Sequence, residues 1–140
     1  MTYNIERFYD VHKAYFDIAL KEIQSGKKQS HWMWYIFPQL KSLGQSYTAI
    51  SYGIENAEEA KQFYEDDYLG ANLKKICKAL LECKSNNALE VMGYPDNLKL
   101  RSSMTLFYLA VGDKLFSDVL EKFYNGNPDE ITKNQICSEK

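Results

Sequence analysis

The sequence of 140 residues predicts an all-α fold: a compact single domain of about six or seven helices, with no sheet. Apolar side chains recur at three- and four-residue steps in most segments, and this spacing places them on one face of a helix. No segment alternates apolar and polar residues with a period of two, as a half-buried strand does. We therefore expect residues 1–140 to form one unit, with a frayed tail over 136–140.

A long first helix is expected over residues 5–25, where apolar residues form one continuous face. Asn4 is a suitable N-cap, and Gly26 can end the helix in the left-handed conformation. His12 lies beside the apolar face, and we interpret it as a half-buried structural histidine rather than a catalytic one.

A second, short helix is expected over residues 31–37, with Ser30 as its N-cap and Pro38 at its end. The unpaired N–H groups of such a helix N-terminus favour an anion. Residues 40–55 are rich in Ser, Gly and Thr, and they predict the longest irregular segment of the chain. Binding groups often lie on loops of this kind.

The rest of the chain repeats the helical pattern. Asn56 is expected to cap the first of these later helices, Asn87 a single turn, and Asp96 the helix that follows. The helix after Asp96 is apolar nearly all round, which is typical of a central, buried helix. The expected helices span residues 57–64, 68–83, 97–111, 115–123 and 129–136.

Composition excludes several classes of protein. The formal charge of −2 argues against a general nucleic-acid binder, whose phosphate contacts need an excess of Lys and Arg. No apolar run is long enough to cross a membrane, and the N-terminus does not resemble a signal peptide. Three cysteines without C-x-x-C spacing indicate a reducing, cytoplasmic compartment, and neither they nor the two histidines have the spacing of metal ligands. We expect no metal and no cofactor.

The stretch 30–39, SHWMWYIFPQ, concentrates aromatic residues around a histidine and a glutamine. Aromatic walls with a few polar groups are typical of a ligand pocket, although a folding core also uses aromatic residues. Trp34 is three residues from His31 and shares its helical face, so it could stack on a planar ligand or anchor the core. His31 could carry a proton or donate a hydrogen bond to an anion, and Gln39 could supply polar recognition.

Lysines flank this stretch. Lys27 and Lys28 precede Ser30, where they could surround an anion at the start of the short helix. A pair of solvated lysines beside an aromatic core helix is the alternative.

A second unusual stretch, KLRSSMTLF at 99–107, places charged and hydroxyl side chains on the central helix. The Arg101 guanidinium needs an acceptor, which could be an anionic ligand or an internal carboxylate. Ser102, Ser103 and Thr105 could donate to the same ligand, or could bond back to carbonyls of their own helix. Lys99 adds a further positive charge. The internal carboxylates that could pair with Arg101 are those of Asp10, Asp96 and Glu90.

Several ordered motifs carry a resemblance to a known family. They are GKK at 26–28, SHWMW at 30–34, FPQ at 37–39, GQS at 44–46, YGI at 52–54, LG at 69–70 and KLRSSMTLF at 99–107. In these motifs the chain resembles a bacterial family that is catalogued as a domain of unknown function and often mislabelled calpastatin. The resemblance implies a compact all-α fold and no established activity. The chain departs from the family pattern at His12, where relatives often carry glutamine, and at 66–68, where a His-Pro pair is common.

Two functions remain open. The first is a pocket, formed by 30–39 together with 99–107, for a small anionic ligand such as a nucleotide or an NAD/ADP-ribose-like metabolite. If the protein is an enzyme, transfer or hydrolysis at a glycosidic or phosphoryl centre fits these residues, with His31 carrying the proton and Arg101 stabilising charge. The second is a non-catalytic protein-interaction module that uses the aromatic stretch 30–39. The sequence does not indicate an oligomeric state.

Overall fold

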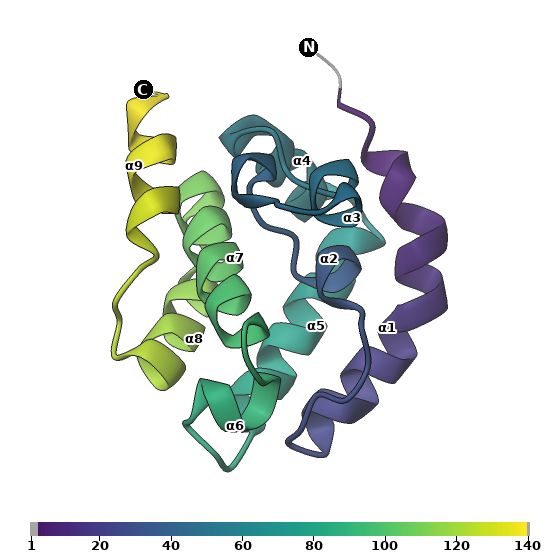
Figure 1. The fold of residues 1–140 in the computed structure, drawn as a ribbon, viewed down its shortest axis with the longest axis vertical. Helices are drawn as coiled ribbons and strands as arrows, with labels where there is room; N and C mark the ends of the chain where they lie inside the picture. Colours follow the sequence, from purple (N-terminus) through teal and green to yellow (C-terminus); the bar gives the residue numbers. More distant parts are fainter. Residues whose placement is uncertain (1–2, 140) are drawn as a thin grey trace.

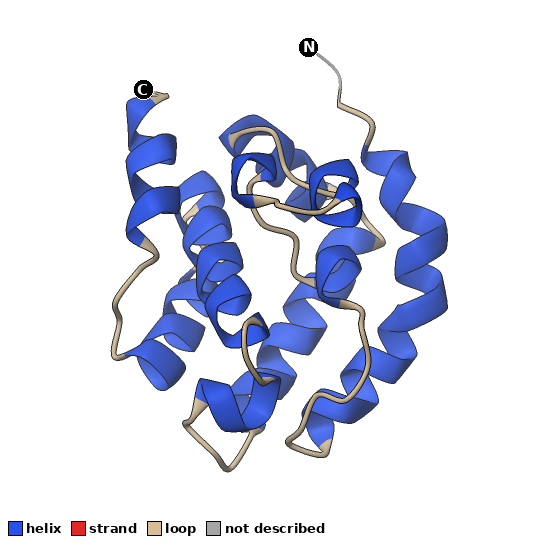
Figure 2. Ribbon diagram, in the orientation of Figure 1, coloured by secondary structure: helices blue, strands red, loops and turns tan. Residues whose placement is uncertain are grey.

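The computed structural model describes residues 3–139 as an all-helical fold (Figures 1 and 2). The helices are η1 (Ile5–Phe8), α1 (Tyr9–Gln24), α2 (Met33–Ile36), η2 (Lys41–Leu43), α3 (Tyr47–Ser51), α4 (Ala57–Glu65), α5 (Leu69–Glu82), α6 (Ala88–Met92), α7 (Asp96–Val111), α8 (Lys114–Tyr124) and α9 (Glu130–Ser138). Within residues 3–139 there is no strand, only one isolated bridge between Leu40 and Ile54. The predicted fold class is confirmed, and the helices outnumber the expectation because several are single turns.

Helix α7 is the central element of the fold. It packs against α4, α6, α8 and α9, while α5 packs against α1, α4 and α8 (Figure 1). Its residues from Ser102 to Phe107 are all buried, so the helix has no polar face over this stretch. The sequence predicted this position from the apolar residues around the helix.

Helix caps show which start signals act as expected. Asn56 Oδ1 accepts from Glu59 N at 3.0 Å, and Asn87 Oδ1 accepts from Leu89 N at 3.0 Å, as predicted. Asn4 makes no capping hydrogen bond with its side chain. Asp96 is the first residue of α7 rather than its cap, and its carboxylate pairs with Lys28, which lies outside the helix.

The last helix, α9, ends at Ser138, two residues beyond the end expected from the sequence. Ile136 is buried in the core, and the Glu139 carboxylate accepts from Ala57 N at 3.1 Å. These contacts hold the end of the chain against the start of α4, while residues 1, 2 and 140 lie outside the described part.

His12 is buried in the core and serves a structural role there. Its Nδ1 lies 2.9 Å from the carbonyl oxygen of Tyr35, and Asn72 Nδ2 lies 3.2 Å from Nε2. A carbonyl only accepts, so Nδ1 carries the hydrogen and Nε2 accepts from the Asn72 amide. Burial lowers the pKa of His12, although the bond to Tyr35 opposes this effect.

We expect the stability of the protein to fall as the pH drops below about 6.5, the ordinary histidine pKa. The unfolded chain takes up a proton at His12 in this range, whereas the folded chain takes it up only at lower pH. Urea unfolding at several pH values would measure the trend. A His12→Gln variant can still contact Asn72 and Tyr35 but does not titrate, so it should depend less on pH. An equal pH dependence in both proteins would contradict this role.

Candidate functional site

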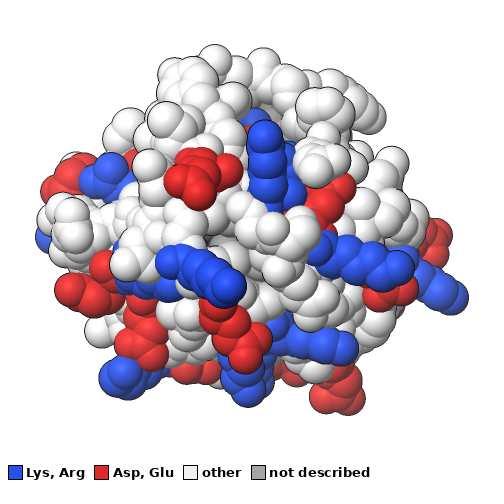
Figure 3. Space-filling view, turned by 90° about the horizontal axis from the view of Figure 1, so that it is seen from below, with Lys and Arg blue, Asp and Glu red and all other residues white. Residues whose placement is uncertain are grey.

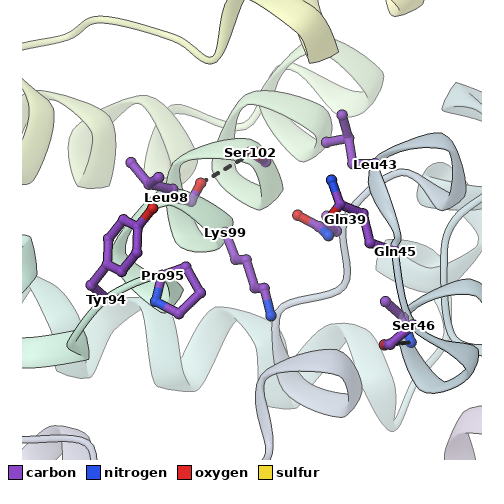
Figure 4. Close-up of a pocket in the computed structure, with 10 residues that line it drawn as sticks. Gln39, Leu43, Gln45, Ser46, Tyr94, Pro95, Leu98, Lys99 and Ser102 are labelled. Carbon is purple, nitrogen blue, oxygen red and sulfur yellow. Dashed lines mark hydrogen bonds between the residues drawn. The ribbon is translucent and has the colours of Figure 1, made fainter.

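An open groove lies between the start of α7 and the segment that follows α2. Its volume is about 490 Å³, and Figure 4 shows the Lys99 side chain extending into it. We call it the Lys99 groove. It is lined by Gln39, Leu43, Gln45, Ser46, Ala49, Tyr94, Pro95, Leu98, Lys99 and Ser102.

Two smaller hollows adjoin the Lys99 groove and share residues with it. The inner hollow holds about 10 Å³, room for roughly one water molecule, and is lined by aromatic residues including Trp34. The outer hollow holds about 300 Å³ and reaches His31 and Ser30. Lys99 lines all three spaces. The structure therefore brings the 30–39 stretch and the start of the 99–107 stretch together, as predicted.

The Lys99 ammonium has two neighbours, and neither binds it tightly. Its Nζ lies 5.3 Å from the centroid of the Trp34 ring and 3.7 Å from Asp96 Oδ1. A cation over an aromatic face is held weakly, and an ion pair at 3.7 Å is long. The ammonium is thus positioned by the protein but keeps hydrogen-bonding capacity for a ligand.

Trp34 holds Lys99 by one face of its ring, which changes its expected role. That face cannot at the same time stack on a planar ligand. The Trp34 Nε1 group is buried and has no hydrogen-bond partner among residues 3–139. Unsatisfied donors of this kind are uncommon and mark sites where water or a ligand can complete the bonding.

Lys28, in contrast to Lys99, is held by close contacts with other residues of the protein. Its Nζ lies 2.7 Å from Asp96 Oδ2, donates to the Ser30 carbonyl and lies 4.8 Å from the Trp32 ring centroid. Only 5% of its side chain is exposed. Asp96 therefore faces both lysines at once and binds Lys28 more closely.

The anion expected at the start of the short helix is a carboxylate of the protein itself. Glu22 accepts hydrogen bonds from Gln29 N at 2.8 Å, Ser30 N at 3.0 Å, Ser30 Oγ at 2.6 Å and Trp32 Nε1 at 2.9 Å. Burial alone would raise the pKa of Glu22, but these four bonds lower it to about 2. Ser30 is consequently not an N-cap, and α2 begins only at Met33.

The far wall of the groove belongs to the segment 39–54, which is less irregular than predicted. It contains η2 and α3, and Ser46 caps α3 by accepting from Ala49 N at 3.1 Å. Two backbone bonds close its ends: Lys41 N donates to Ile54 O at 2.7 Å, and Ile54 N donates to Gln39 O at 2.8 Å. We call these bonds the neck of the segment. The wall then presents the side chains of Gln39 and Gln45 to the cavity (Figure 4).

Arg101 does not line any of the three spaces. It donates to the backbone carbonyl oxygens of Asn127 at 3.1 Å and Pro128 at 2.8 Å, rather than to one of the carboxylates expected from the sequence. Lys99 and Arg101 are two residues apart on one helix, and their side chains point about 200° apart. Arg101 thus attaches the connection between α8 and α9 to α7.

The hydroxyl groups near Arg101 are used mainly within the protein. Ser102 Oγ donates to Leu98 O at 3.2 Å, and Thr105 Oγ1 donates to Arg101 O at 2.8 Å. Thr105 Oγ1 also accepts from Asp129 N at 2.9 Å. Ser102 lines the Lys99 groove, whereas Ser103 is fully buried and lines none of the three spaces.

The remaining predicted site residues lie at the margin. His31 is exposed and lines the outer hollow, while Lys27 is exposed and lines none of the three spaces. Sequence reasoning missed Tyr94, which is 76% exposed and lines both the groove and the outer hollow. It also missed Gln45, Ser46 and Leu98. The only available signal for Tyr94 was its place in a Gly-Tyr-Pro turn directly before α7.

Surface charge and possible metal ligands were compared with the expectations from the sequence. Acidic and basic side chains are interspersed on the face shown in Figure 3, without a continuous positive area. Within residues 3–139, no group of three His, Cys, Asp or Glu side chains is arranged to hold a metal ion. In the same part of the chain, every helix is too short or too polar to cross a membrane.

The fold and the candidate site together define a compact helical domain with an open groove around one lysine. Comparison with known proteins identifies its family. Residues 2–136 match the family described as "Protein of unknown function (DUF1810)", and the chain belongs to it. The crystal structure of the conserved hypothetical protein Rv1873 from Mycobacterium tuberculosis is similar, with 36% identity over 96% of both chains and a TM-score of 0.93. A search of curated proteins gave no match.

Proposed function

We propose that the Lys99 groove binds a small anionic ligand that carries a planar group, and that nucleotides and NAD- or ADP-ribose-like metabolites are the first ligands to test. The observation that carries this proposal is the position of Lys99, a cation with spare hydrogen-bonding capacity that lines all three spaces. Charge-assisted bonds from lysine to an anion are among the stronger interactions in a binding site.

The other residues of the groove support this type of ligand. Gln39 and Gln45 can each donate and accept hydrogen bonds, which suits the edge of a base or the hydroxyl groups of a sugar. Tyr94 and Pro95 offer exposed apolar surface on the opposite side, so Tyr94 takes the stacking role first expected of Trp34.

A more specific form of the proposal is that the groove also catalyses a reaction of the bound ligand. His31 lines the outer hollow beside Lys99, where it could move a proton during transfer or hydrolysis at a glycosidic or phosphoryl centre. Arg101 is bound to backbone carbonyls elsewhere, so the stabilisation of developing charge would fall to Lys99. Product formation from any bound nucleotide, lost in a His31→Gln variant that still binds it, would support an enzyme.

Replacing Lys99 by methionine should weaken ligand binding by about tenfold or more, because a hydrogen bond to a charged group contributes about 1.5–3 kcal/mol. Methionine keeps an unbranched side chain over Trp34 and removes only the charge. Isothermal titration calorimetry with AMP, cyclic AMP, NAD and ADP-ribose would measure the effect.

Two control variants test whether the effect belongs to this groove. Lys27→Met removes an exposed lysine that lines none of the three spaces, and should leave binding unchanged. Arg101→Gln should lower the melting temperature without a comparable loss of affinity, because its bonds are to Asn127 and Pro128. Equal losses in Lys27→Met and Lys99→Met would show that the ligand binds elsewhere.

A protein-interaction module is the second candidate, but on a different surface from the one first considered. Trp32 and Phe37 of the aromatic stretch are buried, so they cannot contact a partner. Tyr47, which is 88% exposed, and Tyr94 are the two most exposed aromatic side chains among the described residues. If a partner used these anchors, Tyr47→Ala and Tyr94→Ala would reduce its binding, whereas Lys99→Met would not.

A further inference from the structure

We propose that the Lys99 groove selects a ligand whose anionic group carries one negative charge, such as a carboxylate or a phosphodiester, over a ligand with a dianionic phosphate. This inference rests on the proposed function, because it assigns the charge of the group that the groove binds. The argument comes from the charged residues that line the three spaces and from how they pair.

Few charged side chains surround the site. Among the described residues that line the groove and its two hollows, the charged ones are Lys28, Lys99 and Asp96, with His31 at the edge. Two lysines facing one aspartate therefore leave a single positive charge without a partner.

That remaining charge belongs to Lys99. Asp96 lies 2.7 Å from the Lys28 ammonium but 3.7 Å from the Lys99 ammonium, so Lys28 takes the closer pairing. Lys28 is also more deeply buried, with 5% of its side chain exposed against 26% for Lys99. Moving Lys28 toward a ligand would break its nearly buried ion pair with Asp96, which is costly.

A second negative charge on the ligand would find no cation. It would lie close to Asp96, which is already within 3.7 Å of Lys99. The Glu22 carboxylate, bonded to Ser30 Oγ at 2.6 Å, adds further negative charge near the outer hollow. Two like charges about 4 Å apart repel by about 1 kcal/mol even in water. A monoanion balances Lys99 without this repulsion.

The test compares ligands that differ in charge. Calorimetric titration of the full chain at about pH 8 would use cyclic AMP, a monoanion, against AMP, whose phosphate is a dianion above its second pKa of about 6. Adenosine serves as the neutral reference. A second pair, benzoate against phthalate, repeats the comparison without a nucleoside. We expect the monoanion of each pair to bind about fivefold more tightly or better.

Two variants test whether Asp96 sets this preference. Asp96→Asn leaves two uncompensated lysines, so AMP should bind at least as well as cyclic AMP. In this variant Lys28 loses its ion pair with Asp96, so the folding of the variant is checked by circular dichroism. The double variant Lys28→Met with Asp96→Asn again has one uncompensated cation and should recover the preference for the monoanion. Recovery separates the charge balance from the shape of the ligand.

The outcomes distinguish the two proposals. Tighter binding of the dianion by the natural chain overturns the charge inference and leaves the anion groove standing. Equal binding of adenosine and cyclic AMP removes the need for an anion and overturns both. An absence of binding by all five compounds also overturns both. A monoanion preference that the Asp96→Asn variant reverses and the double variant restores supports the inference.

Discussion

Arg7→Ala is expected to destabilise the protein by about 3–5 kcal/mol, the cost of removing one partner of a buried ion pair. The Arg7 guanidinium lies 2.7 Å from Glu59 Oε2, and only 4% of the Glu59 side chain is exposed. It also donates to the carbonyl oxygens of Ser51 at 3.0 Å and Gly53 at 2.7 Å. Without Arg7, the buried Glu59 carboxylate loses its ion pair and keeps the bond from Glu55 N at 2.7 Å, while two carbonyl groups lose a donor.

Urea unfolding would measure this loss, and an exposed pair provides the matched control. Lys114 and Asp118 are also 2.7 Å apart, but the Lys114 side chain is 83% exposed. Lys114→Ala should therefore change stability by no more than about 0.5 kcal/mol. Adding Glu59→Gln to Arg7→Ala should restore part of the stability, since the unpaired charge is removed. Similar costs for the Arg7 and Lys114 variants would contradict the buried role of Arg7.

Arg7 also connects stability to the groove. The carbonyl groups of Ser51 and Gly53 that it binds belong to the segment whose other residues form the groove wall. We expect faster hydrogen exchange at the Ile54 amide in Arg7→Ala than in the Lys114→Ala control. Ligand affinity should fall in the same variant, although Arg7 lies outside the groove.

Gly70→Ala is expected to cost more than about 3 kcal/mol, beyond the usual range for overpacking. A Cβ atom at this position would lie 1.9 Å from the carbonyl oxygen of Tyr64 and 2.8 Å from its carbonyl carbon. Both atoms are backbone, so relief requires α4 and α5 to move apart. In a helix, alanine is ordinarily more stabilising than glycine. A loss of stability in Gly70→Ala would therefore be the opposite of the usual effect.

Gly112→Ala separates this steric effect from backbone strain. Gly112 ends α7 with φ of +74°, and an added Cβ would meet nothing within 4 Å. Its replacement should cost only about 1–2 kcal/mol, the penalty of a left-handed conformation. Thermal unfolding of both variants would compare them. If Gly70→Ala were as stable as the natural chain, the close approach of the two helices would be wrong.

The long helices could be predicted because their cause is local in sequence. Apolar spacing identified α1, α4, α5, α7 and α8, and Asn56 and Asn87 capped helices as their residue types suggest. Ser30 has an equally good capping side chain, yet it fails. Its hydroxyl donates to Glu22, a residue of the preceding helix that no local pattern connects to it.

The site was predictable in part for the same reason. Trp34, Gln39 and Lys99 were chosen for unusual chemistry in their local sequence, and they do meet. Arg101 was chosen by the argument that a buried guanidinium needs an acceptor, which is correct, but backbone carbonyl groups have no sequence signature. Tyr94 owes its place to the path of the turn before α7, which only the fold reveals.

The neck of the groove wall has a consequence for how specificity can change among related proteins. Two backbone hydrogen bonds fix Lys41 and Ile54, and a Cβ on Gly53 would lie 2.4 Å from the Lys41 Cα, so the ends are held tightly. Lengthening a closed loop costs little, about 0.6 kcal/mol for each doubling. The stretch between η2 and the Ser46 cap of α3 can therefore be lengthened while the helical frame stays intact. Changes in this part of the wall, by evolution or by design, could therefore alter which ligand the groove binds.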